Sequence, residues 1–291
     1  MNKLFSKKVC VLLLLCLAGV TAFAQKGYKK AYTLFDANGK EIGYDELVAA
    51  LAQPDVVFIG EIHNCCITHW LEYELARSLY AIHKDKLMMG AEMLEADNQL
   101  ILDEYMNRQI SYDRFEAEAR LWDNYSPFVF FANENRIPFI ATNVPRRYAN
   151  VVKDRGLQYL DSLSDEAKRY LPPLPVSFTY KEEEQGAFAL MHMMGKSKGN
   201  AEYLAQAQAI KDATMGWFIA RNMKSKFLHF NGNYHSDFQG GIIPYLLQYR
   251  PGTTIKTVCS VRQESIGQLD EENKGRADFY ICVPEDMTST Y

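Results

Sequence analysis

The chain has 291 residues, 48% of them hydrophobic and 23% charged, with 32 Lys and Arg against 36 Asp and Glu. This composition is typical of a globular protein with enough apolar material for one large core or two modest ones. An acidic chain without runs of basic residues binds nucleic acid poorly, so we expect no nucleic-acid partner.

The first 24 residues have the pattern of a secretory signal peptide. Three lysines precede an apolar run at 9–20, and Ala22-Phe23-Ala24 then forms a small-residue cleavage site before Gln25. The run is shorter than the roughly 20 apolar residues that cross a bilayer, and no later stretch approaches that length. We therefore predict a cleaved signal, no transmembrane segment in the mature chain, and a periplasmic or secreted product.

Cleavage would change the charge and the cysteine content of the chain. Removing residues 1–24 leaves 29 Lys and Arg against 36 Asp and Glu, a net charge of −7, and leaves Cys65, Cys66, Cys259 and Cys282. An oxidising compartment allows a disulfide, and Cys259 and Cys282 could pair if their predicted strands are neighbours, with buried free thiols as the alternative. No cysteine follows the small residues of the signal at the position used for acylation, so we expect no lipid anchor.

The mature chain begins with a predicted hairpin, followed by a series of buried strands. Asn38-Gly39, which suits the positive φ angles of a tight turn, lies between extended stretches at 31–35 and 41–44. The unbroken apolar run at 56–59 is too continuous for a strand with one wet face and too short for a stable helix, so it predicts a buried parallel strand. Five further runs have the same character: 87–91, 137–141, 227–230, 255–261 and 279–283.

Helical patterns alternate with these strands. The segment 201–223 has apolar residues at helical spacing, and the segment 68–82 places four of them on one face: Leu71, Leu75, Leu79 and Ile82. Strands that alternate with helices predict a parallel sheet. We therefore expect one α/β domain over residues 25–291, with a predominantly parallel sheet flanked by helices.

Two segments, 95–136 and 145–226, are too long to be simple crossovers between strands. A structureless loop of that size is uncommon in a compact domain, and the apolar spacing at 201–223 indicates helix in the second segment. We predict helical insertions above the sheet at both places. The smaller helical part of the fold is expected at about residues 145–225.

Polar residues follow four of the predicted strands, at the point where each strand ends. The four segments are Gly60-Glu61-Ile62-His63, Gly90-Ala91-Glu92-Met93, Asn143-Val144-Pro145-Arg146 and Gly232-Asn233-Tyr234-His235. In open parallel sheets, ligands bind outside the carboxyl ends of the strands. We therefore predict a single pocket at one edge of the sheet, built from Glu61, His63, Glu92 and His235.

These four residue types allow proton transfer or metal binding. Glu61 and Glu92, as neighbours, would repel each other, which raises the pKa of at least one carboxyl or makes the two share a cation or an imidazolium. His63 and His235 fit either role. Two His with two carboxylates could also hold a divalent metal ion, although the spacing matches no compact zinc motif. In the structural alternative, the carboxylates cap helices and the imidazoles are hydrogen-bonded loop residues.

The remaining histidines are predicted to have structural roles. His69 and His83 lie on or just after a helix, where surface and boundary positions are common. His229 alternates within a strand and is predicted to be a hydrogen-bonded core residue. His192 lies in the Met-rich stretch 190–194, which packs in the core or lines a flat apolar ligand.

The strand-end segments resemble those of the ChaN-like haem-binding uptake family, in a superfamily that includes the Tiki proteases and, more distantly, the erythromycin esterases. The resemblance covers roughly residues 34–283 and includes Gln208, Asp212 and Met215 in the long helix. It implies a parallel α/β domain with a smaller helical part, located in the bacterial envelope and binding haem in an iron-uptake setting.

The resemblance also implies how haem is held. In the haem-binding relatives a tyrosine holds the iron, and a partner subunit can contribute a histidine across a dimer that encloses paired haems. A phenolate suits ferric iron because it is a hard anionic oxygen donor. The preferred ligand in this chain is Tyr234, with His192 as a helper, and Arg146 and His235 belong to the same predicted haem site. Familiar relatives are lipoproteins, so the missing acylated cysteine is a departure from the family.

Two functions are compatible with these residues. A haem-binding protein of iron or haem acquisition would take haem between the carboxyl edge of the sheet and the helical insertion, as a homodimer, with envelope haem-transport components as partners. A metal-dependent or Glu/His hydrolase would use Glu61 or Glu92 to polarise water and His235 or His63 to transfer the proton. We favour haem binding on the resemblance, because a shared fold does not decide between the two.

Overall fold

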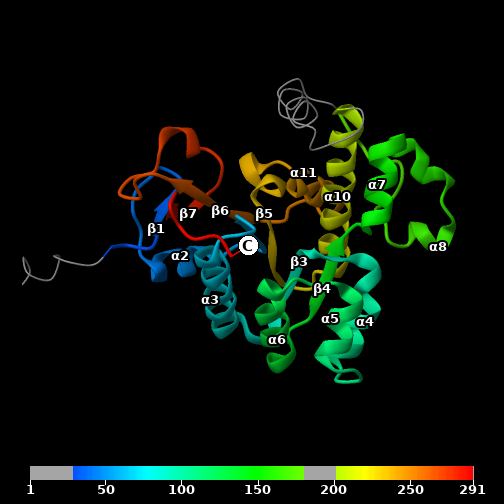
Figure 1. Cartoon of the computed structure of the whole chain (residues 1–291), viewed down its shortest axis with the longest axis horizontal. Helices are drawn as coiled ribbons and strands as arrows, with labels where there is room; N and C mark the ends of the chain where they lie inside the picture. Colours follow the sequence, from blue (N-terminus) through cyan, green and yellow to red (C-terminus); the bar gives the residue numbers. More distant parts are fainter. Residues whose placement is uncertain (1–28, 180–200, 291) are drawn as a thin grey trace, which may run out of the picture. The chain divides into compact units, whose positions relative to one another are not determined.

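The computed structural model describes residues 29–179 and 201–290 (Figure 1). The signal predicted at 1–24 and His192 lie outside the described residues. The chain divides into two units, Met1–Ala31 and Tyr32–Tyr291, and all the helices and strands described below belong to the second. Its strands are β1 (Thr33–Asp36), β2 (Val56–Glu61), β3 (Leu87–Glu95), β4 (Phe139–Asn143), β5 (Lys226–Gly232), β6 (Ile255–Gln263) and β7 (Phe279–Pro284).

These strands form one sheet that is parallel except at one edge. The strand order is β1-β7-β6-β2-β5-β3-β4, and β1 runs antiparallel to β7. The other neighbouring pairs are parallel. The predicted α/β class with a predominantly parallel sheet is therefore confirmed. Because β5 lies between β2 and β3, these two consecutive strands are not neighbours.

Helices cover both faces of the sheet (Figure 1). The largest core cluster joins one face to α2, α3, α4, α5 and α6, and a second cluster joins the other face to α10 and α11. A smaller cluster packs α7 against α10. The helices are α2 (Tyr44–Leu51), α3 (Cys66–His83), α4 (Gln99–Met106), α5 (Tyr112–Ala119), α6 (Ser126–Asn135), α7 (Arg146–Arg155), α8 (Asp165–Lys168), α10 (Ala201–Asn222) and α11 (Ile242–Tyr249).

The central strands send alternate side chains to the two helical layers. In β2, Val57 and Ile59 belong to the core that contains α3, whereas Val56 and Phe58 belong to the core that contains α10 and α11. A strand buried on both faces needs apolar residues at every position, which explains the unbroken run at 56–59.

The predicted hairpin is incomplete, and the two strand cysteines are free thiols. Gly39 does form a turn with φ of 79°, but the second arm of the hairpin is reduced to a single bridge at Glu41, because β1 joins the main sheet beside β7. Cys259 and Cys282 lie on the adjacent strands β6 and β7, as the disulfide prediction required. They are two residues out of register, since Cys282 pairs with Val261, and both thiols are free.

Both long connections contain helices where they are described. Residues 95–136 include α4, α5 and α6, and residues 145–226 include α7, α8 and α10. Within the described ranges, none of the helices combines the length and the apolar character needed to span a bilayer.

Candidate functional site

The two strand-end carboxylates lie on opposite faces of the sheet. Glu61 continues the alternation of Val57 and Ile59 in β2, and it contacts His69 of α3. Glu92 of β3 contacts His235, which in turn contacts α10 on the other face. Each carboxylate therefore has its own hydrogen-bond partners. His63 connects the two groups, because it bonds Glu61 and lines a cavity together with Glu92.

Glu61 is held in a buried hydrogen-bond cluster. Its side chain is fully buried, and its Oε1 accepts hydrogen bonds from His63 Nδ1 at 2.5 Å and from the Tyr125 hydroxyl. Burial alone would raise the pKa of Glu61, but the hydrogen bond from His63 and the neighbouring His69 ring lower it to about 2. The hydrogen bond to Glu61 in turn raises the pKa of His63. An ionised carboxylate thus orients the His63 ring.

Two residues of α3 complete this cluster, although the sequence analysis assigned neither of them a functional role. His69 Nε2 lies 3.3 Å from Glu61 Oε2, and His69 is buried rather than at the surface. Glu72 is fully buried, and its burial, together with the charge of Glu61, raises its pKa well above the usual range. The available signal was helical spacing, because both residues lie on the same inward face of α3 as Leu75 and Ala76.

His235 lies between two carboxylates. Its Nδ1 is 2.5 Å from Asp212 Oδ1 in α10, and its Nε2 is 3.1 Å from Glu92 Oε1. Burial alone would lower the pKa of His235, but the charges of Glu92 and Asp212 raise it to about 10. An imidazolium has no free lone pair, so this arrangement does not favour His235 as a general base near neutral pH.

Glu92 is fixed by the backbone of β5 as well as by His235. The Gly232 amide donates a hydrogen bond to Glu92 Oε2 at 2.8 Å. Although burial opposes ionisation, the charge and hydrogen bond of His235 and the Gly232 amide hold the pKa of Glu92 well below its usual range. Gly232 is also a point of close approach, because a Cβ there would lie 2.9 Å from His63 Nε2 and 3.5 Å from Glu92 Oε2.

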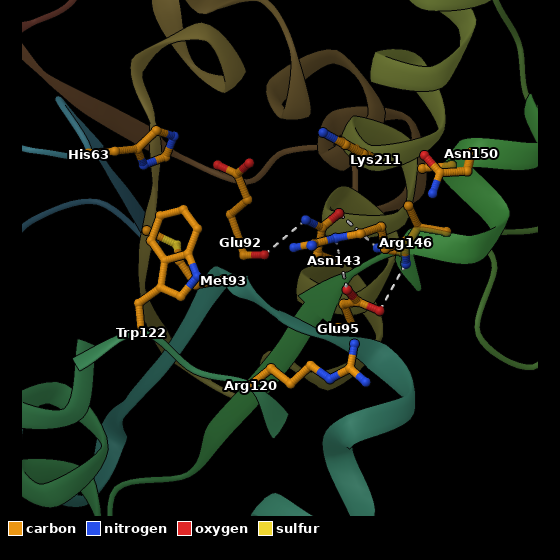
Figure 2. Close-up of a pocket in the computed structure, with 12 residues that line it drawn as sticks. His63, Glu92, Met93, Glu95, Arg120, Trp122, Asn143, Arg146, Asn150 and Lys211 are labelled. Carbon is orange, nitrogen blue, oxygen red and sulfur yellow. Dashed lines mark hydrogen bonds and ion pairs between the residues drawn. The ribbon is translucent and has the colours of Figure 1, made fainter. Parts of the chain in front are cut away.

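A cavity of about 390 Å³ opens beside Glu92 at the carboxyl edge of the sheet (Figure 2). Figure 2 shows the Glu92 carboxylate and the Lys211 ammonium pointing toward one another, with the Trp122 indole beside His63. The apolar lining comes from Met93, Trp122, Val144 and Ala149, and the cationic lining from Arg120, Arg146 and Lys211. Two carboxylates, Glu92 and Glu95, also line the cavity, and Glu95 pairs with Arg146. A site of this composition suits a ligand with an apolar body and anionic groups.

The residues predicted for haem occupy different positions. Arg146 begins α7 and lines the cavity, and its backbone amide donates to Glu95 Oε2 at 2.8 Å. Tyr234 lies in the 3₁₀ turn η5 (Asn233–His235), is 51% exposed, and packs edge-on against the His235 ring. Neither Tyr234 nor His235 is among the described residues that line the cavity.

The core role predicted for His229 is confirmed. Its ring is fully buried, with Nε2 2.8 Å from Thr142 Oγ1 and Nδ1 3.0 Å from Asn231 Oδ1. His229 therefore belongs to the sheet interior and not to the cavity.

Sequence reasoning missed several lining residues, among them all the cationic ones except Arg146. Arg120 and Trp122 follow α5, inside the predicted insertion at 95–136, and no local pattern distinguishes them from other loop residues. Lys211 was closer to detection, because it precedes Asp212 in a segment singled out by the family resemblance.

The described residues bring together one set of acids and imidazoles close enough to share a metal ion, namely Glu61, His69 and Glu72. The four ligands predicted from the sequence do not form such a group. Those four predicted ligands are Glu61, His63, Glu92 and His235. The hydrolytic alternative that uses these residues stays a prediction.

Comparisons with known proteins agree with this architecture. A family model described as haem-binding uptake, Tiki superfamily, ChaN matches residues 47–246. The structure is similar to a ChaN structure from Campylobacter jejuni that shows cofacial haem binding, with a TM-score of 0.65 and 18% identity over 87% of this chain and 97% of that one. It is also similar to an erythromycin esterase, with a TM-score of 0.50 and 11% identity over 89% of this chain and 99% of that one. No curated protein sequence matches the chain.

Proposed function

Because this chain belongs to the ChaN family of haem-binding uptake proteins in the Tiki superfamily, we propose that it binds haem in the cavity at the carboxyl edge of the sheet. The composition of the cavity carries the proposal. Haem has a flat apolar ring and two propionate groups. Trp122 and Val144 offer apolar contacts to the ring, while Arg120, Arg146 and Lys211 offer charges to the propionates.

Two side chains at this edge are candidates for the iron ligand. Tyr234 offers an exposed phenol, and a phenolate suits ferric iron. His63 lines the cavity, and because Glu61 holds its Nδ1, Nε2 is the nitrogen left for a metal. We favour Tyr234 on the family resemblance. Because Tyr234 does not line the cavity, this assignment requires the haem to extend from the cavity to η5.

The proposal extends to iron or haem acquisition in the cell envelope, after export by the signal at 1–24 and with haem-transport proteins as partners. We also propose that the protein binds haem as a homodimer. Tyr234 is 51% exposed, so a haem bound to it would leave part of its apolar ring in water unless a second subunit covered that surface. His192 is the residue that such a subunit could add to the site.

A hemin titration of the mature protein, followed by visible absorption, tests the proposal. We expect a saturable spectral change in the wild type and at least a roughly tenfold weaker affinity in Tyr234→Phe, because the iron loses its anionic ligand. Tyr249→Phe is the matched control, since Tyr249 ends α11 and packs against Trp217 near the end of α10 that leads into β5. It should bind like the wild type.

Each outcome of this titration has a defined meaning. A wild-type protein without a saturable change rejects haem binding. Equal affinities of wild type and Tyr234→Phe reject the ligand assignment, and a loss in His63→Gln would then identify His63 as the ligand. Chromatography of the hemin-loaded protein tests the homodimer.

Gly232→Ala tests the location of the haem. The backbone of Gly232 has φ of −59° and ψ of 143°, which alanine adopts without strain, but the new methyl group would displace His63 beside the cavity. We expect a folded protein with hemin affinity reduced by roughly tenfold, as follows when a site is displaced by about 1 Å. Gly43→Ala, where a Cβ meets nothing within 4 Å, should bind normally. Normal binding by both variants would place the haem elsewhere.

A further inference from the structure

We propose that Glu61, His69 and Glu72 form a binding site for one divalent transition-metal ion of the zinc type, separate from the haem site. The ligand atoms of these residues lie within 4.8 Å of one another. Glu61 ends β2, and the other two residues lie one turn apart on α3. The site lies between Glu61 and α3, on the carboxylate oxygen of Glu61 that does not bond His63. It shares only Glu61 with the metal ligands predicted from the sequence.

Unpartnered buried atoms point to a missing ligand at this place. Glu61 Oε2, His69 Nε2 and both carboxyl oxygens of Glu72 are buried without a hydrogen-bond partner. Buried polar atoms in folded proteins nearly always have a partner. Glu61 Oε2 and His69 Nε2 lie 3.3 Å apart, a distance at which both atoms could bind one ion.

The spacing of these atoms fits an ion. Metal bonds of about 2.0–2.2 Å at a tetrahedral angle place two ligand atoms roughly 3.3–3.5 Å apart, and Glu61 Oε2 and His69 Nε2 are 3.3 Å apart. Glu72 would complete the set by an inward movement of at most roughly 1.5 Å, given bonds of that length and separations within 4.8 Å. Three protein ligands leave the fourth position for water.

The charge of the cluster also favours a divalent ion. Two carboxylates and a neutral imidazole together carry two negative charges. Glu72 and the Glu61 side chain are fully buried, and the His69 side chain is only 10% exposed, so water cannot stabilise that charge. The competing occupant is a proton held by Glu72, and the experiment below separates the two.

An ion at this site would act on the cavity through one carboxylate. Glu61 Oε2 faces the ion, while Glu61 Oε1 accepts hydrogen bonds from His63 Nδ1 and the Tyr125 hydroxyl. Occupancy would therefore fix the Glu61 carboxylate and, through it, the His63 ring that lines the cavity. The ion has a positioning role, and its binding does not depend on haem.

Titration of the chelator-treated mature protein with Co²⁺, followed by visible absorption, tests this site without hemin. We expect one equivalent of Co²⁺ to bind, Zn²⁺ to displace it, and Zn²⁺ to raise the unfolding temperature. Glu72→Gln keeps the shape of the side chain and removes its charge, so binding should weaken at least roughly tenfold. Glu74→Gln is the matched control, because Glu74 lies on the same helix and pairs with Arg77 at the surface. It should bind like the wild type.

Three results would overturn the assignment. The first is a wild-type protein that shows no saturable Co²⁺ spectrum, which leaves the proton as the occupant. The second is a folded Glu72→Gln protein that binds Co²⁺ like the wild type, with His69→Gln as the replacement variant if Glu72→Gln does not fold. The third is loss of binding in Glu92→Gln but not in Glu72→Gln, which would place the ion in the cavity.

Discussion

The pKa values of His235 and His229 are shifted in opposite directions because the two rings have different partners. His235 is buried between two carboxylates, which raise its pKa to about 10. His229 is buried beside Thr142 and Asn231, which carry no charge, so burial lowers its pKa to about 4 despite the hydrogen bond that its Nδ1 donates to Asn231 Oδ1, which opposes the shift. One residue type therefore supplies a fixed cation in one place and a neutral hydrogen-bonding group in another.

The neutral state of His229 predicts a loss of stability in acid. Between an unfolded pKa near 6.5 and a folded pKa of about 4, the unfolded chain binds a proton that the folded chain does not bind, so the free energy of unfolding falls as the pH falls. The full effect is roughly 3 kcal/mol. Urea unfolding of wild type and His229→Gln, from about pH 7 to about pH 4.5, measures it.

The comparison isolates His229 because every other titrating group is common to both proteins. His229→Gln should be less stable than the wild type at neutral pH, where it loses a buried hydrogen-bonded ring, and the difference should shrink in acid. A difference that stays constant with pH would show that His229 does not titrate in this range.

At the scale of elements, the sequence predicted what local patterns determine. The apolar runs at 56–59 and 227–230 became β2 and β5, and the spacing at 68–82 became α3. The set of α3 residues that face the core was harder to predict. Leu71, Leu75 and Leu79 are buried as expected, whereas Ile82 is 52% exposed, and the polar residues His69 and Glu72 take inward positions instead. An apolar stripe cannot reveal buried polar residues whose partner lies on a distant strand.

The sequence also could not predict that Glu61 and Glu92 have different partners, because this depends on contacts between distant parts of the chain. The sequence shows that Glu61 and Glu92 each end an apolar run, but the face that each carboxylate takes depends on strand register, and a shift of one residue reverses it. The position of β5 between β2 and β3 depends on pairing between residues far apart in the chain. The common edge of the site was therefore predictable, and the separate partners of the two acids were not.

At the scale of the whole molecule, the net charge and the cavity have opposite signs. The chain has a net charge of −4, whereas three cationic side chains, Arg120, Arg146 and Lys211, outnumber the two carboxylates, Glu92 and Glu95, in the cavity lining. Hemin carries two propionates, so the distant surface charge repels it and the cationic lining attracts it. Salt screens both effects, and the sign of the salt dependence therefore shows which one dominates.

We expect the cationic lining to dominate, because its charges line the proposed haem cavity and outnumber the two carboxylates there, whereas the charges outside the lining lie farther away. Raising the ionic strength from about 0.05 M to about 0.5 M shortens the Debye length from roughly 14 Å to roughly 4 Å, and hemin affinity should fall several-fold. Lys211→Gln should flatten this dependence, and hemin dimethyl ester, which lacks the propionate charges, should show little of it. If salt instead strengthens hemin binding, repulsion by the net charge controls association and the propionates do not contact these side chains.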